Sequence, residues 1–316
     1  RPGRFDKKIR VDVPDLEGRR DILAYYLSKM SHDETIDPLV LSSETPFYTP
    51  SALKYLLNEG LRYALFDDRT VMNITDIRKA QPEHEYGLRM PIKNMTLEDK
   101  RRLCAHEAGH ALAVRLFRPH YRISRITVIR QGAALGYVQS YPALEEDQMI
   151  AHMTVDSLET QLLVAVGGRA GELEFCGTGE MTLGVGGDFH NVRSVLHRMA
   201  EAGLFGQLQF VVERRARRPG ESPDQRAMPQ PQDAHIIERM EETFRMALDE
   251  VRMAMRLHHD MGEALINLLM EKDELMANEV EEFFDRYGLH TPKVSLPGQL
   301  SEVIDLETPR RAASSS

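Results

Sequence analysis

The run His106-Glu107-Ala108-Gly109-His110 constrains this 316-residue chain more strongly than any other feature. In an α-helix, positions i and i+4 lie on one face, so His106 and His110 can bind the same metal ion. Glu107 would then reach a water molecule held by that ion, and this pattern is typical of zinc metalloproteases. Because roughly one chain in twenty of this composition would contain the pattern by chance, its surroundings must also be considered.

The surrounding residues predict that the run lies in the middle of a helix. The segment Thr96-Leu97-Glu98-Asp99 fits a capping box, and apolar residues then recur as far as Pro119. Gly109 inside such a helix costs about 1 kcal/mol relative to alanine. That cost is understandable if another backbone or a metal site packs closely there. The alternative is a solvated helix face that happens to carry two histidines.

A catalytic zinc site needs a third protein ligand. The extended pattern H-E-x-x-H-x-x-G-x-x-H would place glycine and histidine where this chain has Ala113 and Leu116. A glutamate ligand on the following helix is also excluded, because the first glutamate after Glu107 is Glu145. The third ligand is therefore expected far along the chain, and the candidates are Glu172, Glu174, Asp188 and His190.

Asp188 is the preferred candidate for the third ligand. It follows the glycine-rich run 184–187 and opens a helical stretch predicted at residues 191–204. The backbone would then position its short side chain. The alternative role for Asp188 is an ordinary helix N-cap.

Composition narrows the class of protein. Forty Lys and Arg residues against 49 Asp and Glu give a net charge of −9, which argues against a nucleic-acid surface. Cys104 and Cys176 are too few for a disulfide framework, so a reducing compartment and a cytoplasmic localisation are expected, with Cys104 in the core. No apolar run approaches the ~20 residues of a membrane span, and no G-x-x-x-x-G-K-[ST] phosphate loop occurs.

Three segments together resemble the FtsH family of AAA proteases. They are His106–Ala111, the run Gly167-Gly168-Arg169-Ala170 followed by Glu172, and the glycine-rich turn that ends in Asp188. The resemblance implies that His106, His110 and Asp188 bind Zn²⁺ and that Glu107 is the catalytic base.

The amino-terminal residues support the same resemblance. Arg1-Pro2-Gly3-Arg4-Phe5-Asp6 is similar to the close of the family's ATPase core, where residues matching Arg1 and Arg4 reach the nucleotide of a neighbouring subunit. Residues 16–80 resemble the helical lid subdomain of that ATPase, with helices predicted at Arg19–Met30, Thr49–Phe66 and Thr75–Lys79. ATP would act only through an upstream region. The chain is therefore interpreted either as the carboxy-terminal part of a longer protease, whose membrane anchor also lies upstream, or as a natural truncation of one.

The remaining chain is expected to form the peptidase. Strands are predicted at 124–129 and 137–139, a helix at 156–175, and three further helices at 234–258, 261–270 and 277–287. Glu172 could accept a hydrogen bond from the second nitrogen of a ligand imidazole, or it could be a surface carboxylate. The resemblance implies that the second strand lies beside the zinc, where an unfolded substrate could pair with its free edge. The basic run 214–218 is expected to be part of a mobile linker.

These observations predict a mainly α-helical protein with a small β-sheet, organised in three parts. Residues 1–90 would hold the end of the ATPase core and the lid, residues 91–292 the zinc metallopeptidase domain, and residues 293–316 a disordered tail, with a linker between Pro82 and Pro91. The predicted function is a zinc-dependent endopeptidase that degrades unfolded proteins as part of a homo-hexameric, ATP-dependent machine. The alternatives are a catalytically idle oligomerisation scaffold of the same fold and a small-molecule zinc hydrolase.

Overall fold

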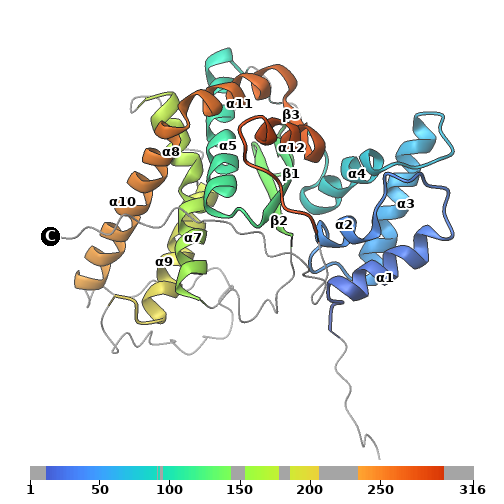
Figure 1. Cartoon of the computed structure of the whole chain (residues 1–316), viewed down its shortest axis with the longest axis horizontal. Coiled ribbons are helices and arrows are strands. Elements are labelled where there is room, and N and C mark those ends of the chain that lie inside the picture. The colour runs from blue at the N-terminus through green and yellow to red at the C-terminus, as the bar shows by residue number, and fades with distance from the viewer. Residues whose placement is uncertain are drawn as a thin grey trace, which may run out of the picture.

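The computed structural model describes residues 12–90, 92, 95–143, 154–177, 186–205 and 234–294. The first four helices pack together on one side of the molecule (Figure 1). Each of them begins at an Asp, Thr or Asn whose side chain accepts a hydrogen bond from a backbone N–H of the first turn. These helices are α1 (Leu16–Leu27), α2 (Pro38–Ser43), α3 (Pro50–Phe66) and α4 (Ile74–Tyr86).

The rest of the described chain forms a second unit around one long central helix (Figure 1). That helix is α5 (Leu97–Phe117), and its amino terminus is closed by the predicted capping box between Thr96 and Asp99. The other elements are β1 (Tyr121–Thr127), β2 (Tyr137–Pro142), α7 (Val155–Ala165), α8 (Gly167–Phe175), α9 (Gly186–Glu201), α10 (Ala234–Leu257), α11 (His259–Lys272), β3 (Glu274–Met276) and α12 (Ala277–Asp285). The prediction of a mainly helical fold with a small sheet is confirmed.

Each unit has its own hydrophobic core. The first core gathers buried side chains of α1, α3 and α4, such as Leu23, Leu57 and Ile77. The second core is larger and includes Leu112 of α5 and Leu265 of α11, together with the buried thiol of Cys104, as expected. The predicted domain boundaries at residues 90 and 292 stay predictions.

The sheet is antiparallel, with the strand order β2-β1-β3. Both predicted strands are present, and β1 pairs with β2 from Tyr121 opposite Pro142 to Thr127 opposite Tyr137. The short strand β3, which the sequence analysis did not predict, pairs with the other side of β1. Within the described part of the chain, β2 is therefore an edge strand.

Helices α5 and α8 approach each other through glycines. A Cβ atom added to Gly109 would lie 2.4 Å from the carbonyl oxygen of Gly167, and one added to Gly171 would lie 2.3 Å from the carbonyl oxygen of Ala105. Side chains at these positions would force the two backbones apart. The expectation that another backbone packs against Gly109 is thus confirmed, and its physical cause is the need for α8 to lie directly on α5.

Two of the predicted helices differ from the observed ones. The single helix expected at 156–175 is wrong, because the chain breaks at Val166 into α7 and α8. The break places Gly167 against α5, where its added Cβ would meet the Ala113 side chain at 2.9 Å. The interpretation of Asp188 as a helix N-cap is also wrong, since α9 already begins at Gly186 and Asp188 lies in its first turn.

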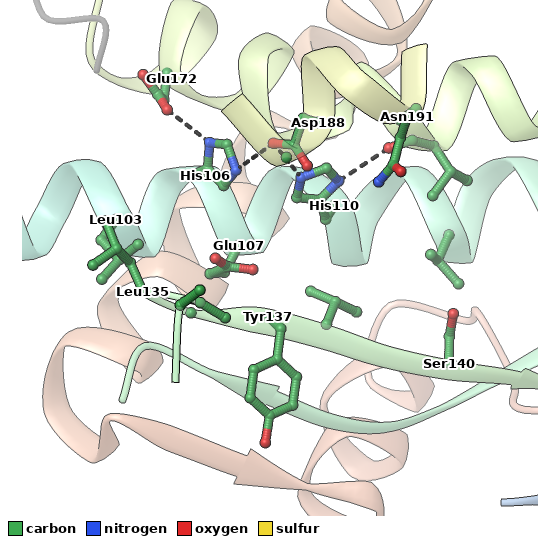
Figure 2. Close-up of a pocket in the computed structure, with 18 of the residues that line it drawn as sticks. Leu103, His106, Glu107, His110, Leu135, Tyr137, Ser140, Glu172, Asp188 and Asn191 are labelled. Carbon is green, nitrogen blue, oxygen red and sulfur yellow. Dashed lines mark hydrogen bonds and ion pairs between the residues drawn. The ribbon is translucent and has the colours of Figure 1, made fainter. Parts of the chain in front are cut away.

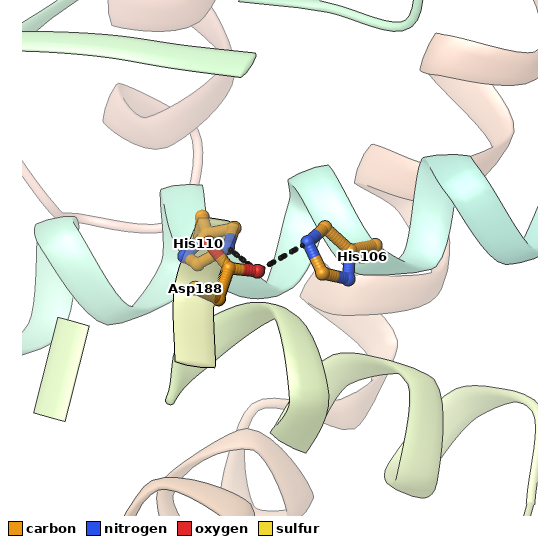
Figure 3. Close-up of side chains that lie close together, drawn as sticks. All are labelled: His106, His110 and Asp188. Carbon is orange, nitrogen blue, oxygen red and sulfur yellow. Dashed lines mark hydrogen bonds and ion pairs between the residues drawn. The ribbon is translucent and has the colours of Figure 1, made fainter. Parts of the chain in front are cut away.

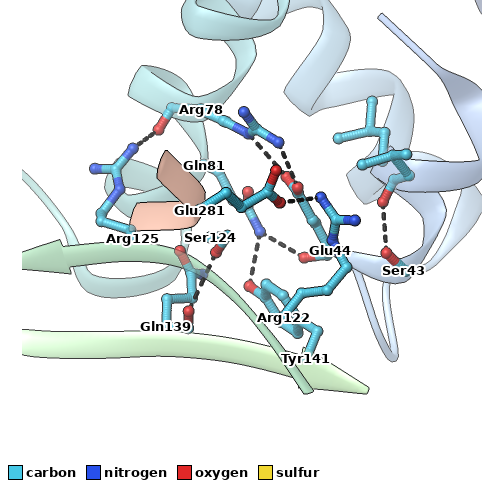
Figure 4. A network of polar contacts seen from close by, with 12 residues as sticks. Ser43, Glu44, Arg78, Gln81, Arg122, Ser124, Arg125, Gln139, Tyr141 and Glu281 are labelled. Atoms are coloured by element: carbon cyan, nitrogen blue, oxygen red, sulfur yellow. Dashed lines mark hydrogen bonds and ion pairs between the residues drawn. The ribbon is translucent and has the colours of Figure 1, made fainter. Parts of the chain in front are cut away.

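The predicted start of the linker at Pro82 is wrong as well. Pro82 is buried within α4, which continues to Tyr86. Proline has no N–H to donate to the carbonyl four residues earlier, and here that carbonyl belongs to Arg78. The guanidinium of Arg125 on β1 donates a hydrogen bond to it instead, as Figure 4 shows. A side chain from the second unit therefore satisfies the backbone group that proline leaves unpaired.

Other groups join this contact between the two units. Gln81 of α4 donates to the carbonyl of Glu44 at 2.7 Å and to the hydroxyl of Tyr141 on β2 at 3.0 Å. Gln139 of β2 donates to the Glu85 carboxylate at 2.7 Å. The edge strand β2 is thus attached to α4 through its side chains.

None of the helices in the described ranges is both long enough and apolar enough to cross a lipid bilayer. The basic run 214–218 and residues 295–316 of the predicted tail lie outside those ranges, as do Arg1 and Arg4.

Candidate metal centre

Helix α5 carries the two histidines of the sequence pattern on one face. Four residues separate His106 from His110, which brings their ring centroids to 4.9 Å at an interplanar angle of 75°. Both side chains are largely buried, with 13% and 14% of their surface exposed. The geometry of α5 alone is therefore sufficient to place the two imidazoles side by side.

Helices α7 and α8 fix the orientation of both rings. Nδ1 of His106 lies 2.7 Å from Oε1 of Glu172, whose side chain is completely buried, and Nδ1 of His110 lies 3.0 Å from the carbonyl oxygen of Val164. That carbonyl is in the last turn of α7, where helical carbonyls lack an i+4 partner. Each imidazole that donates through Nδ1 keeps a lone pair on Nε2, the arrangement that metal-binding histidines require.

Asp188 reaches the same point from the first turn of α9. Its Oδ2 lies 2.8 Å from Nε2 of His106 and 3.2 Å from Nε2 of His110, as Figure 3 shows. One ring nitrogen of each histidine and one oxygen of this carboxylate lie within 4.8 Å of one another. Three groups that can bind one cation are thus supplied by two helices, although 78 positions separate His110 from Asp188 in the sequence.

The charges of these groups are strongly coupled. Burial would raise the pKa of Asp188, but its hydrogen bonds with His106 and His110 outweigh burial and hold the pKa below its usual range. Burial would lower the pKa of His106, yet its hydrogen bonds with Asp188 and Glu172 raise it to about 10. Two carboxylates therefore compensate the charge of this buried imidazole when no metal is bound.

A glycine leaves the space between the two imidazoles open. A Cβ atom added to Gly168 would lie 2.5 Å from Nε2 of His106 and 2.6 Å from Nε2 of His110. Any other residue would press a side-chain atom against both Nε2 atoms. Two imidazole nitrogens, one carboxylate oxygen and an open space beside them match the donor set of a catalytic zinc ion. The residues present therefore fit such an ion.

Glu107 lies next to the histidines, on the side of α5 that faces the loop before β2 (Figure 2). It is only 4% exposed, and a Cβ atom on Gly136 of that loop would lie 2.6 Å from its Oε1. Burial raises the pKa of Glu107 to about 7, because desolvation outweighs the attraction of the two imidazoles. A carboxylate with a pKa near neutrality is suited to accept and return a proton.

These residues line a cleft of about 800 Å³ between α5, β2 and α9. Apolar side chains from α5 and β2, such as Leu103 and Val138, form much of its wall. Glu107, both histidines and Asp188 also line it. The candidate metal centre is therefore open to a molecule of peptide size.

The structure does not bring the other candidate ligands to this point. Glu174 forms an ion pair with Arg256 at 3.0 Å, and His190 is exposed to solvent. The sequence analysis missed the carbonyl of Val164 and the close contact of Gly136 with Glu107. A carbonyl has no side-chain signature, whereas the glycines 136 and 168 could have been found as positions where a backbone approaches a reactive side chain.

Comparison with known proteins places this architecture in a family. Residues 93–283 match the model of peptidase family M41. The chain belongs to this family. The prediction from sequence of an FtsH-like metalloprotease is therefore confirmed at the level of the family and the enzyme class. The segment matched by the M41 model includes every residue of the candidate metal centre.

Three relatives illustrate how this M41 chain is related to longer proteins. It is 33% identical over 199 residues to the ATP-dependent zinc metalloprotease FtsH of Acidobacterium capsulatum, covering 63% of this chain and 30% of the relative. It is 29% identical over 325 residues to FtsH 4 of Sorangium cellulosum, covering 99% and 49%. It is 29% identical over 199 residues to YME1L1 of Homo sapiens, covering 63% and 25%. The chain spans less than half of each of these relatives.

Proposed function

We propose that this chain is a zinc-dependent endopeptidase that cleaves unfolded proteins and flexible peptides. The observation that carries the proposal is the convergence of His106, His110 and Asp188 beside Glu107 in a peptide-sized cleft. In a scaffold without catalytic activity, four buried ionisable groups so close together would lower the stability of the fold without any functional gain. The names of the relatives, which are zinc metalloproteases, support the same metal.

The proposed chemistry assigns a role to each side chain of the centre. His106, His110 and Asp188 would hold the zinc ion, and Glu172 would keep His106 in the tautomer whose Nε2 is free. A zinc ion bound there would polarise the scissile carbonyl and make a water molecule more acidic. Glu107 takes a proton from the attacking water and returns it to the leaving amine.

The position of β2 supports an extended substrate. This strand lies at the edge of the sheet and lines the cleft with residues such as Val138 and Ser140. A peptide in extended conformation can add to an edge strand through main-chain hydrogen bonds, which require little of its sequence. Such pairing needs a segment that is free of its own secondary structure, so unfolded chains are the substrates that fit.

The larger machine implied by the family resemblance rests on sequence alone. The names of the relatives support an ATP-dependent protease. Arg1 and Arg4 at a neighbouring subunit's nucleotide, assembly of six copies, and a cytoplasmic location stay predictions. We infer that the chain by itself cleaves flexible substrates slowly and without ATP, and that folded proteins require the ATPase.

A pair of glutamate substitutions on α5 tests this function. The purified chain is incubated with zinc and either casein or a quenched fluorescent peptide, in the absence of ATP. Glu107→Gln should abolish cleavage while bound zinc, measured by elemental analysis, stays unchanged. Glu98→Gln, on the same helix but with its side chain 70% exposed, should cleave like the wild type. A wild-type chain that holds zinc yet cleaves neither substrate would favour the scaffold, and hydrolysis of small esters alone would favour the small-molecule hydrolase.

A further inference from the structure

The cleft continues past the candidate metal centre to Arg118 at the end of α5. His106, His110, Val114 and Arg118 follow one another at intervals of four residues, and all of them line the cleft. Arg118 is the C-cap of α5. With a rise of 1.5 Å per residue, it lies about 12 Å beyond His110 along the helix axis.

The guanidinium of Arg118 is half-buried and differs from its neighbours in its partners. Its carbon lies 4.8 Å from the centroid of the Tyr121 ring, and burial lowers its pKa. Nearby, Arg115 donates to the carbonyls of Pro119 and Tyr121, and Arg122 pairs with Glu281 at 2.5 Å. Within the described ranges, no carboxylate pairs with Arg118. A partly buried cation without an anion is costly, and an anionic ligand would remove that cost.

The charges along the cleft are separated in the same direction. Asp99 lies at the end of the cleft near Leu103, where Thr96 and Arg102 already occupy its carboxylate oxygens. Arg118 lies at the opposite end of α5, and Arg198 of α9, which donates to Gln161 at 2.5 Å, also lines the cleft. The end of the cleft beyond His110 therefore attracts negative charge.

We propose that Arg118 binds a carboxylate of the substrate and thereby makes the peptidase selective for acidic segments. This inference rests on the proposed function of the metal centre. An extended peptide advances about 3.3 Å per residue, so a distance of about 12 Å corresponds to three or four residues between the scissile bond and the carboxylate. The ligand is the side chain of Asp or Glu at that place, or the terminal carboxylate of a substrate that ends there.

The planar guanidinium suits this role because it can hold both oxygens of a carboxylate with two parallel hydrogen bonds. A hydrogen bond to a charged group in a half-buried site changes affinity by about tenfold or more. Main-chain pairing with β2 would supply binding that is independent of sequence, and Arg118 would add a preference at one position. Arg118 acts on substrate choice and takes no part in the proton transfers.

Matched peptides test the proposal. One quenched fluorescent sequence is prepared with Glu, Gln or Lys at the third or fourth position on either side of the scissile bond, with amidated ends. The wild type should cleave the best-placed Glu peptide with a kcat/KM about tenfold above that of the Gln peptide, mainly through KM. Peptides without Glu that end at the same place, with a free or an amidated carboxyl terminus, distinguish the terminal carboxylate from an acidic side chain.

Variants separate recognition from folding. Arg118→Ala should cleave the Glu and Gln peptides with equal kcat/KM, whereas Arg118→Glu should prefer the Lys peptide. Arg245→Ala, on the exposed face of α10, should keep the wild-type preference. Loss of the tenfold ratio of kcat/KM between the Glu and Gln peptides in Arg118→Ala, together with a preference for Lys in Arg118→Glu, is a result that a purely structural role of Arg118 would not produce.

Binding provides a readout that does not depend on turnover. Fluorescence anisotropy with zinc-loaded Glu107→Gln should show about tenfold tighter binding of the Glu peptide than of the Gln peptide, and the double variant with Arg118→Ala should bind both equally. Equal binding and equal cleavage of the two peptides by proteins that contain Arg118 would overturn the selectivity while leaving the protease function intact. Absence of any cleavage, with the selectivity of binding preserved, would instead count against the protease function alone.

Discussion

Two clusters of buried polar residues differ in whether their polar groups face the interior or a cleft. The contact between the two units, shown in Figure 4, contains the side chains of Arg125, Glu44 and Gln81. Arg125 and Gln81 donate to the backbone carbonyls of Arg78 and Glu44, and the Glu44 carboxylate forms an ion pair with Arg78. At the metal centre, the Nδ1 atoms are paired in the same manner, but both Nε2 atoms and the carboxylate of Asp188 converge on the wall of a cleft (Figure 2).

This difference distinguishes a cluster that stabilises the fold from one that can bind a ligand, whereas burial alone does not. A buried cluster that satisfies itself stabilises one arrangement of the chain and offers nothing to a ligand. A cluster whose ring nitrogens and carboxylate converge on one point of a cleft can exchange its internal hydrogen bonds for a bound cation. Substitutions in the two clusters should therefore affect different measurements: unfolding for the contact between the units, and metal binding for the centre.

The largest effect is expected from Arg125 in the contact between the units. Arg125→Ala removes the partner of the Arg78 carbonyl and one partner of Glu274, to which Arg125 is bonded at 3.0 Å. Breaking a buried ion pair of this kind costs about 3–5 kcal/mol. The free energy of unfolding, measured in urea, should fall by that amount, while the folded fraction keeps its zinc.

An exposed ion pair provides the control for Arg125. Arg256 is 65% exposed where it pairs with Glu174, so Arg256→Ala should unfold at nearly the same urea concentration as the wild type. Loss of zinc from folded Arg125→Ala would show that the two clusters are not independent.

An intermediate effect is expected from a methyl group added at the metal centre. Gly168→Ala places a Cβ within 2.6 Å of both Nε2 atoms, which Glu172 and Val164 hold in place through the opposite sides of the rings. Displacing the ligands by about 1 Å should lower kcat/KM about 100-fold. Gly187→Ala, also in the cleft but with nothing within 4 Å of its added Cβ, should behave like the wild type. Equal activities of the two variants would mean that the imidazoles do not work in the observed positions.

The smallest effect is expected from Glu172, which contacts His106 on the side of the ring opposite Nε2. Glu172→Gln keeps the shape of the side chain but removes the charge that orients His106, and such changes weaken metal affinity by about 10–100-fold. Competition with a zinc-sensitive dye would measure the change. Glu174→Gln, two residues further along α8 and bonded to Arg256, should leave zinc affinity unaltered. If both variants bind zinc like the wild type, the hydrogen bond to His106 has no influence on the metal.

Local signals predicted much of this architecture. The capping box at Thr96 and the i, i+4 spacing of the histidines act within one helix, so the sequence alone predicts α5 and the face that carries both imidazoles. Asp188 could be proposed only from its place after a glycine run and from family resemblance. Its arrival beside the histidines depends on the packing of α9.

Contacts between distant residues explain what the sequence did not predict. Pro82 indicates the end of a helix until Arg125 supplies a partner for the Arg78 carbonyl from 47 residues away. Strand β3 has three residues and pairs only because α11 and α12 bring it beside β1. The carbonyl of Val164 becomes a hydrogen-bond acceptor for His110 because α7 ends there. None of these features leaves a periodic pattern in the sequence.

Elemental analysis of the wild type and of Asp188→Ala tests the proposed centre most directly. Both proteins are purified in parallel, exposed to equal zinc, freed of excess by gel filtration, and checked for the same helical content by circular dichroism. The geometry predicts about one zinc ion per wild-type chain and a large loss of zinc in the folded variant, since only two of three ligands remain. A wild type without stoichiometric zinc, or an Asp188→Ala variant with undiminished zinc, would contradict a site built from two imidazoles and this carboxylate.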